Sequence, residues 1–345
     1  MSTQRKIYID LIKSLAVIGV IVIHTSSSLV MFSSGSFRWS AAMIYRSVFG
    51  ASVPLFLMCS GALLLDPQKD MSLKKLYFHS LLRIIIAMLF WTSAYKFYHL
   101  ISDGNLSFYA SVHALKEVIL FTHEFHFYYL HMIIAVYVFL PITRKFVLSA
   151  KKSDLIYFIV VWTVFGILMP TVMTFYPFTL IGGLVPQWMI NLTYSSVGYG
   201  ILGYYLSVNK LSLKNGIIMT VAGSVATFFL TLIFSLKNGT FYEGFLSGVS
   251  PNVFITGVGI YSVCMNTASH MSNKIKDICK TLSSASFCIY LVHVFVIYLF
   301  AHIGFTYQTV NMALYVPAAS LLNLLICLVL WRIIRCIPIL NKYII

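Results

Sequence analysis

Charged side chains are scarce in this chain. Asp, Glu, Lys and Arg make up only 10% of its 345 residues, whereas 59% are hydrophobic. A soluble domain carries roughly 25% charged residues, so the composition excludes an ordinary soluble protein. The shortage is greatest for acidic residues, nine against 24 lysines and arginines. The net charge of +15 does not indicate nucleic-acid binding, because the basic residues lie in short connections between apolar segments, where membrane topology explains them.

Close pairs of cysteines are also missing. The six cysteines are widely spaced, so neither a disulfide framework nor a zinc knuckle is indicated, and no other residue set predicts a metal site. A low-complexity tract, a long linker and an internal repeat are absent too. We therefore expect a single domain over residues 1–345. The first apolar run follows Arg5 and Lys6 like a signal peptide, but it is too long and carries charges, so we interpret it as a retained helix.

Apolar runs of about 20 residues, by contrast, recur from end to end. They predict ten membrane-spanning helices and hence an all-α membrane protein. The expected spans are about 7–32, 41–65, 76–101, 125–148, 155–175, 188–207, 215–236, 250–269, 284–304 and 310–335. The connection at about 102–124 could hold a short interfacial helix at 114–121.

Basic residues concentrate in every second connection. One side of the membrane receives Arg5, Lys6, Lys69, Lys74, Lys75, Arg144, Lys145, Lys151, Lys152, Lys210, Lys214, Lys274, Lys276, Lys280, Arg332, Arg335 and Lys342. The other side receives only Arg38, Lys116 and Lys237. By the positive-inside rule, this alternation predicts that both termini are cytoplasmic.

The first span contains Asp10, Lys13 and His24. Successive residues of an α-helix turn by about 100°, so Lys13 and His24 differ by three full turns plus about 20°, and Asp10 lies close to the same face. Ionisable groups inside a bilayer are costly and mark functional sites by default. The stripe is therefore expected to face protein or water rather than lipid.

Depth along the helices divides the polar residues into two expected clusters. An inner one contains Lys13 and Arg83, two cations suited to an anionic ligand that carries phosphate. An outer one contains His24, roughly 16 Å further along the helix, with His131, His126 or Glu124, and is suited to proton transfer. Asp10 is too far from His24 to orient its ring and is expected to pair with Lys13 one turn away. Glu124 is the first candidate for the carboxylate partner of His24.

Structural explanations exist for each of these residues. Asp10 and Lys13 could form a neutralising pair near the interface, and Arg83 could extend to the membrane surface. A lone buried histidine is often a hydrogen-bonded core residue, which applies to His126, His131 and His293. His24 differs, because it shares its face with two charges.

Several motifs resemble the membrane acyltransferase 3 family. The segment YIDLIKSLAVIGVIVIHTSS resembles the opening of that family, which usually has Arg where this chain has Lys13. SVPLFLMCSGALLL looks like its second-helix motif, which ends in Ser60-Gly61, and Arg83 falls at its third-helix basic position. HFYYL at 126–130 is similar to a His-x-Trp-x-Leu segment, with Tyr128 replacing Trp. SSASFCIYLVHVFVIYLF resembles the signature of its penultimate helix, with Ser286, Tyr290 and His293 in register.

This resemblance implies a multi-pass enzyme of the bacterial cytoplasmic membrane, and the chain's size resembles the branch that O-acetylates surface polysaccharides such as enterobacterial common antigen. Acetyl-CoA or another acyl-CoA would be the donor, and a cell-surface carbohydrate or its lipid-linked precursor the acceptor, with no metal required. Carried over by position, His24 would be the catalytic base, and Lys13 and Arg83 would belong to the donor side. We also expect Asp10, Ser60, Tyr290 and His293 on the donor side, Glu124 and His131 in the catalytic group, and His126 and Tyr128 at the acceptor.

Two other functions fit a chain with many intramembrane polar residues. A transporter or flippase for a lipid-linked sugar would also need them, although the missing internal repeat speaks against it. A structural partner in a surface-polymer assembly is the third possibility, in which His24 has no evident task. Acyl-CoA binding to the purified protein separates the enzyme from both. The acceptor, the acyl group and the oligomeric state are not predicted by the sequence.

Overall fold

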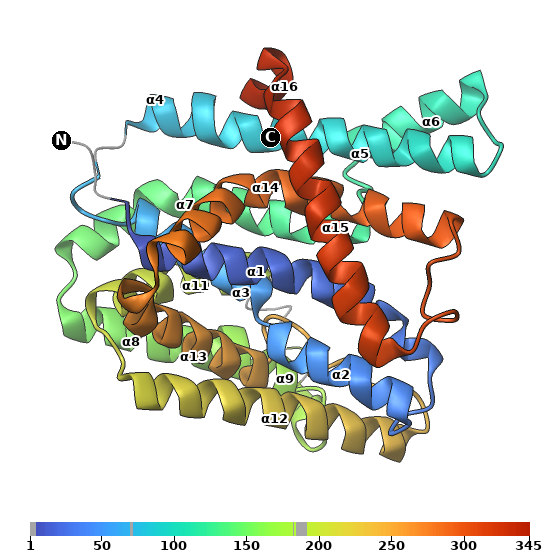
Figure 1. Ribbon diagram of the computed structural model, residues 1–345. Coiled ribbons are helices and arrows are strands. Elements are labelled where there is room, and N and C mark those ends of the chain that lie inside the picture. Colours follow the sequence, from blue (N-terminus) through green and yellow to red (C-terminus); the bar gives the residue numbers. More distant parts are fainter. Residues whose placement is uncertain (1–4, 70–71, 182, 184–191) are drawn as a thin grey trace.

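The structure is a computed structural model in which residues 5–69, 72–181, 183 and 192–345 are described. Figure 1 shows a bundle of helices, and these residues form no β-strand. Eight helical stretches are long and apolar enough to cross a membrane: Ile7–Met31, Phe37–Leu64, Leu73–Ser102, Phe125–Ser149, Lys152–Val172, Leu213–Asn238, Asn273–His302 and Met312–Arg335. The expected fold class, an all-α membrane protein, is confirmed.

Two shorter helices lie where the other two spans were expected. α11 (Leu192–Val208) and α13 (Pro251–Thr267) have 17 residues each, which is the lower limit for crossing the hydrocarbon core. The expected span 188–207 also begins outside the described residues. The total of ten spans and the cytoplasmic position of both termini therefore remain predictions.

The second expected span, 41–65, is two helices rather than one. α2 (Phe37–Phe49) begins earlier than expected, and α3 (Ser52–Leu64) continues after a break at Gly50 and Ala51. Pro54 lies in the first turn of α3. A proline has no backbone N–H and is tolerated there, but inside a continuous helix it would remove a hydrogen bond and clash with the preceding turn.

The other helices follow the expected runs with shifted ends. α1 (Ile7–Thr25) continues as a 3₁₀ turn (Ser27–Met31), α4 (Leu73–Lys75) leads through a π-helical segment (Leu76–Leu81) into α5 (Leu82–Ser102), and α6 (Phe108–Ile119) is longer than the interfacial helix expected at 114–121. The chain continues with a 3₁₀ turn (Phe125–Phe127), α7 (Tyr128–Ser149), α8 (Lys152–Trp162), a π-helical segment (Thr163–Leu168), α9 (Met169–Val172) and a 3₁₀ turn (Phe178–Ile181). After α11 come α12 (Leu213–Asn238), α13, a 3₁₀ turn (Ala268–His270), α14 (Asn273–His302), α15 (Met312–Arg335) and α16 (Pro338–Tyr343).

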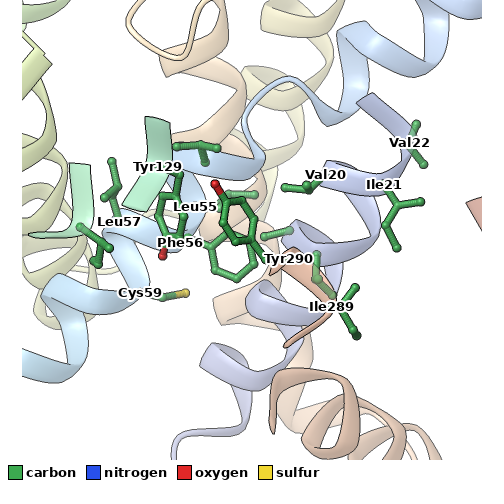
Figure 2. Close-up of a cluster of buried hydrophobic side chains, with 14 of the residues drawn as sticks. Val20, Ile21, Val22, Leu55, Phe56, Leu57, Cys59, Tyr129, Ile289 and Tyr290 are labelled. Carbon is green, nitrogen blue, oxygen red and sulfur yellow. The ribbon is translucent and has the colours of Figure 1, made fainter. Parts of the chain in front are cut away.

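α1 lies at the centre of the bundle and packs against α2, α3, α13, α14 and α15. In Figure 1, α14 runs beside α1, and α15 crosses both obliquely. Figure 2 shows the buried cluster that joins α1 to its neighbours: Val20 and Ile21 of α1, Phe56 of α3, and Tyr129 and Tyr290 of α7 and α14. The polar stripe of α1 thus lies inside the protein, as its sequence predicted.

Two glycines bring α3 and α11 into backbone contact. A Cβ atom at Gly203 would overlap the backbone oxygen of Met58, and one at Gly61 would overlap the backbone of Gly200. Small residues that permit such close approach are a usual means of helix association in membranes, where no water drives apolar surfaces together. The side chains of α3 that line the site described below are held by this contact.

We expect Gly203→Ala to lower the thermal stability of the purified protein in detergent, because the new methyl group forces α11 away from α3. Overpacking of this kind costs about 1–3 kcal/mol. Gly200→Ala is the matched control one turn away, since the nearest atoms to a Cβ there lie at 3.9 Å. Equal melting temperatures for the two variants would contradict this account of the α3–α11 contact.

Candidate active site

A cavity of about 930 Å³ lies among α1, α3, α5, α7 and α14. Its wall includes Lys13 from the first half of α1, Ser60 from α3, and Arg83 from the start of α5. Tyr129 and Tyr290 line it from α7 and from the middle of α14. The structure therefore brings Lys13 and Arg83 to one cavity, as the inner cluster required.

The cavity is strongly cationic. Lys75 and Lys342 line it together with Lys13 and Arg83, and no described carboxylate does. Four positive groups without acidic partners favour a ligand that carries several negative charges, because desolvated cations hold anions more tightly than exposed ones. Neutral donors and acceptors are also present, including the hydroxyl groups of Tyr129 and Tyr290.

Asp10 does not pair with Lys13, contrary to expectation. Both of its carboxylate oxygens accept hydrogen bonds from the guanidinium of Arg5, at 2.6 and 2.9 Å. The planar fork of arginine satisfies two oxygens at once, which a lysine cannot do. Arg5 also donates to the backbone oxygen of Lys280 in α14 at 3.1 Å. Asp10 is 5% exposed and does not line the cavity, so it fastens the start of α1 instead of contacting a ligand.

The C-terminal segment lies at the wall of this cavity. Lys342 and Tyr343 of α16 line it, and Arg83 donates a hydrogen bond to the backbone oxygen of Ile345. The indole Nε1 of Trp91 donates to the oxygen of Ile344 at 3.1 Å. A ligand that engages the full guanidinium of Arg83 therefore has to compete with the protein's own backbone.

Three histidines meet beyond the far end of the cavity. The ring centroid of His24 lies 5.1 Å from that of His293 and 6.2 Å from that of His126. The rings of His126 and His293 are 5.5 Å apart. Helices α1 and α14 contribute one histidine each, and the third comes from the 3₁₀ turn that precedes α7. No three His, Cys, Asp or Glu side chains among the described residues are grouped closely enough to hold a metal ion.

Hydrogen bonding fixes the proton on His293. Its Nδ1 lies 2.8 Å from the backbone oxygen of Tyr290 and 3.2 Å from that of Ile289. A carbonyl oxygen can only accept, so Nδ1 carries the proton, and Nε2 of the neutral ring presents a lone pair. His293 is fully buried, and its Nε2 has no partner among the described residues.

His126 is held rigidly but keeps both ring nitrogens free. It is 1% exposed, and neither nitrogen has a hydrogen-bond partner in the described part of the chain. Its backbone oxygen accepts a hydrogen bond from the hydroxyl of Tyr290, and the ring of Tyr95 packs on it at 5.1 Å. Unpaired polar atoms that deep in a protein are rare, and these lie beside His24 and His293.

Glu124 and His131 are not the partners of His24, contrary to the sequence prediction. Glu124 forms an ion pair with His99 of α5 at 3.5 Å. His131 stacks on His123, with their ring nitrogens 3.1 Å apart. Both residues thereby tie the connection before α7 to neighbouring helices, and burial lowers the pKa of His123. His131 lies in α7, whereas His126 lies in the 3₁₀ turn before it and is the one that contacts His24.

Tyr290 separates the cationic cavity from the histidine cluster. Its side chain lines the cavity, while its hydroxyl is bonded to His126 and its backbone to His293. Figure 2 shows the Tyr290 ring between α1 and Tyr129. His24 and His293 do not line the cavity, whereas Ser60 and Tyr290 do. The binding of a donor by Ser60, Tyr290 or His293 stays a prediction.

Arg46 lies beside the histidine cluster, and sequence analysis predicted no role for it. The Nη1 of Arg46 in α2 donates to the backbone oxygen of Ile23 at 3.4 Å, directly before His24. Arg46 also interacts electrostatically with Tyr128, which is 44% exposed. The sequence does contain an indication of a role for Arg46, because an arginine inside an apolar span marks a functional site by default, as a histidine does.

Residues 6–332 match the sequence model of a family described as an acyltransferase domain. The match covers nearly the whole chain, so the protein belongs to this family, the acyltransferase 3 family. No curated protein and no solved structure matches the chain. The family identifies a membrane acyltransferase, and the transporter alternative gains no support from it.

Proposed function

We propose that this protein is a membrane-embedded O-acyltransferase of the bacterial cytoplasmic membrane, which moves an acetyl group from acetyl-CoA to a hydroxyl of a cell-surface carbohydrate or its lipid-linked precursor. One observation carries the proposal. A cationic cavity, lined by residues of the side that the charge alternation predicts to be cytosolic, leads to Tyr290, which contacts two members of a buried histidine cluster.

The cavity suits the phosphate-bearing end of the donor. Lys13, Lys75, Arg83 and Lys342 would bind the phosphates of coenzyme A, and the arm that carries the thioester would extend along α1 towards the histidines. Lys13 and His24 are eleven residues apart, about 16 Å along the helix axis. The donor therefore has to displace the Tyr290 ring to bring its thioester to His24.

The histidine cluster suits proton transfer. His24 would take the proton from the acceptor hydroxyl while the hydroxyl oxygen attacks the thioester carbon. The carbon–sulfur bond then breaks, and the proton passes from His24 to the sulfur of coenzyme A. The N–H of His126, which has no hydrogen-bond partner among the described residues, would hold the thioester oxygen as negative charge develops on it.

His293 would orient the ring of His24, the role that sequence analysis predicted for Glu124. Its unprotonated Nε2 can accept a hydrogen bond from the second ring nitrogen of His24 and so fix that ring's orientation. The 5.1 Å between these two ring centroids equals, within 0.1 Å, the 5.0 Å between His123 and His131, which are hydrogen-bonded through their ring nitrogens. A small rotation of His24 suffices to make the bond, and such catalytic bonds often tighten only when substrate is present.

His24→Gln is expected to abolish acyl transfer, with a loss of at least about 100-fold, because the general base is gone. Acetyl-CoA affinity should stay unchanged, since His24 does not line the cavity. The measurement is mass spectrometry of cell-envelope glycans from cells that express each variant, where one acetyl group marks the product. His131→Gln serves as the control, and wild-type acetylation by a folded His24→Gln protein would refute the base assignment.

Lys13→Ala and Arg83→Ala are each expected to weaken acetyl-CoA binding by about 10-fold, because each removes a charged hydrogen-bond donor to phosphate. Isothermal titration calorimetry on the purified protein measures the affinity. Lys274→Ala removes an exposed charge from α14 outside the cavity wall and should have no effect. Unchanged affinity in both cavity variants would mean that the donor binds elsewhere.

His293→Asn and His293→Gln are expected to differ. The shorter amide can reach the Tyr290 carbonyl but not His24, so kcat should fall by about 100-fold at unchanged donor KM. The longer amide can place its oxygen near the position of Nε2 and should restore part of the rate. Equal kcat values for the two variants, or a parallel loss of donor affinity, would assign His293 a structural role only.

A further inference from the structure

The charge of Arg46 has no acidic partner in contact. No described carboxylate lies within 4.0 Å of its guanidinium, whose one hydrogen bond runs to the backbone oxygen of Ile23 at 3.4 Å. A guanidinium has five N–H donors, so most of them remain available. Arg46 lies inside a stretch long and apolar enough to span a membrane, where an uncompensated charge is costly.

Arg46 lies next to the residues that we propose to take part in the reaction. Ile23 precedes His24 in α1, and Arg46 interacts electrostatically with His24 itself and with Tyr128. Arg46 is half-buried and its neighbour Tyr128 is 44% exposed, so both border the surface of the bundle. Glu243, an exposed residue in the connection between α12 and α13, acts on Arg46 from a longer distance and balances part of its charge.

This position differs from that of the donor phosphates. Lys13 lies about 16 Å from His24 along α1, whereas Arg46 contacts the residue next to His24. An anion at Arg46 is therefore at the reacting end of the site and on the side opposite the cationic cavity. The acceptor is the molecule whose hydroxyl faces His24. An anion bound at Arg46 would therefore belong to the acceptor.

We propose that Arg46 binds an anionic group of the acceptor, a carboxylate or a phosphate that lies close to the hydroxyl being acylated. The proposal rests on the function proposed above, since it names the acceptor class of that same site. A guanidinium binds both anions through paired hydrogen bonds. The bound anion also balances the positive charge that His24 acquires when it takes the proton.

The test measures binding of small acceptor analogues to the purified protein in detergent, without any donor. Methyl β-D-glucuronoside supplies a carboxylate, sn-glycerol 3-phosphate a phosphate, and methyl β-D-glucoside neither. Saturation-transfer NMR gives the three affinities. We expect one anionic analogue to bind about 10- to 100-fold more tightly than the neutral sugar, the range for hydrogen bonds to charged groups. The anionic analogue that binds more tightly than the neutral sugar identifies the acceptor's anion as a carboxylate or a phosphate.

Variants of two arginines in α2 make the test specific. Arg46→Gln should remove the preference for the anion, and Arg46→Lys should keep part of it, because the charge remains without the planar fork. Arg38→Gln is the matched control. It removes the same charge from an exposed position of α2, where Arg38 lies over the Phe32 ring at 5.8 Å, and should leave the preference intact.

Acetyl-CoA affinity, measured on the same samples, verifies that Arg46→Gln is folded. Equal binding of all three analogues by the wild type, or an unchanged preference in Arg46→Gln, overturns the proposal. Loss of the preference in Arg38→Gln as well would show a general effect of charge and would also overturn it. If the wild type binds the anions through Arg46 but binds no acetyl-CoA, the proposed function fails and the anion site stands.

Discussion

An ionisable side chain inside a bilayer has to find its partner within the protein, because hydrocarbon offers none. Helix α1 carries three such groups, and the rest of the bundle is arranged around them. Arg5 neutralises Asp10, the cationic cavity surrounds Lys13, and two more histidines enclose His24. Helix α14 runs beside α1 and packs against it more extensively than any other described helix. Its backbone accepts hydrogen bonds from Ser14 of α1 at Cys279 and from Arg5, just before α1, at Lys280.

The arrangement separates two kinds of chemistry along one helix. Positive charge gathers around the inner half of α1, where no described carboxylate lines the cavity. Neutral imidazoles gather around the outer half, packed among aromatic rings such as Tyr95 and Phe125. The Tyr290 ring stands between the two regions, with its hydroxyl bonded to the backbone of His126. In the proposed reaction, this arrangement would keep the negative charge of the donor away from the place where the proton moves.

The sequence predicted the features that depend on a single helix. The stripe on α1 follows from 3.6 residues per turn, and the shared depth of Lys13 and Arg83 follows from the alternation of the spans. Pairing between helices was harder to predict. Glu124 and His131 were expected at the depth of His24, but they pair with His99 and His123 instead. Rotation around the helix axis is decided by packing, which a single sequence does not record.

Asp10 shows a second limit of the sequence. Lys13 is one turn away on the same helix, and the local rule for helix pairs favoured it. Arg5 precedes the helix, so its backbone is free to bend and bring a planar guanidinium against both carboxylate oxygens. Arg46 was missed for another reason. Its neighbours His24 and Tyr128 come from α1 and α7. The sequence of α2 alone does not predict which residues of other helices lie beside Arg46.

The end of the chain has a consequence for the charge of the cavity. Ile344 and Ile345 are buried, and their backbone oxygens are bonded to Trp91 and Arg83 beside the cationic cavity. A change that displaces these two residues would release the guanidinium of Arg83 and alter the charge presented to the cavity.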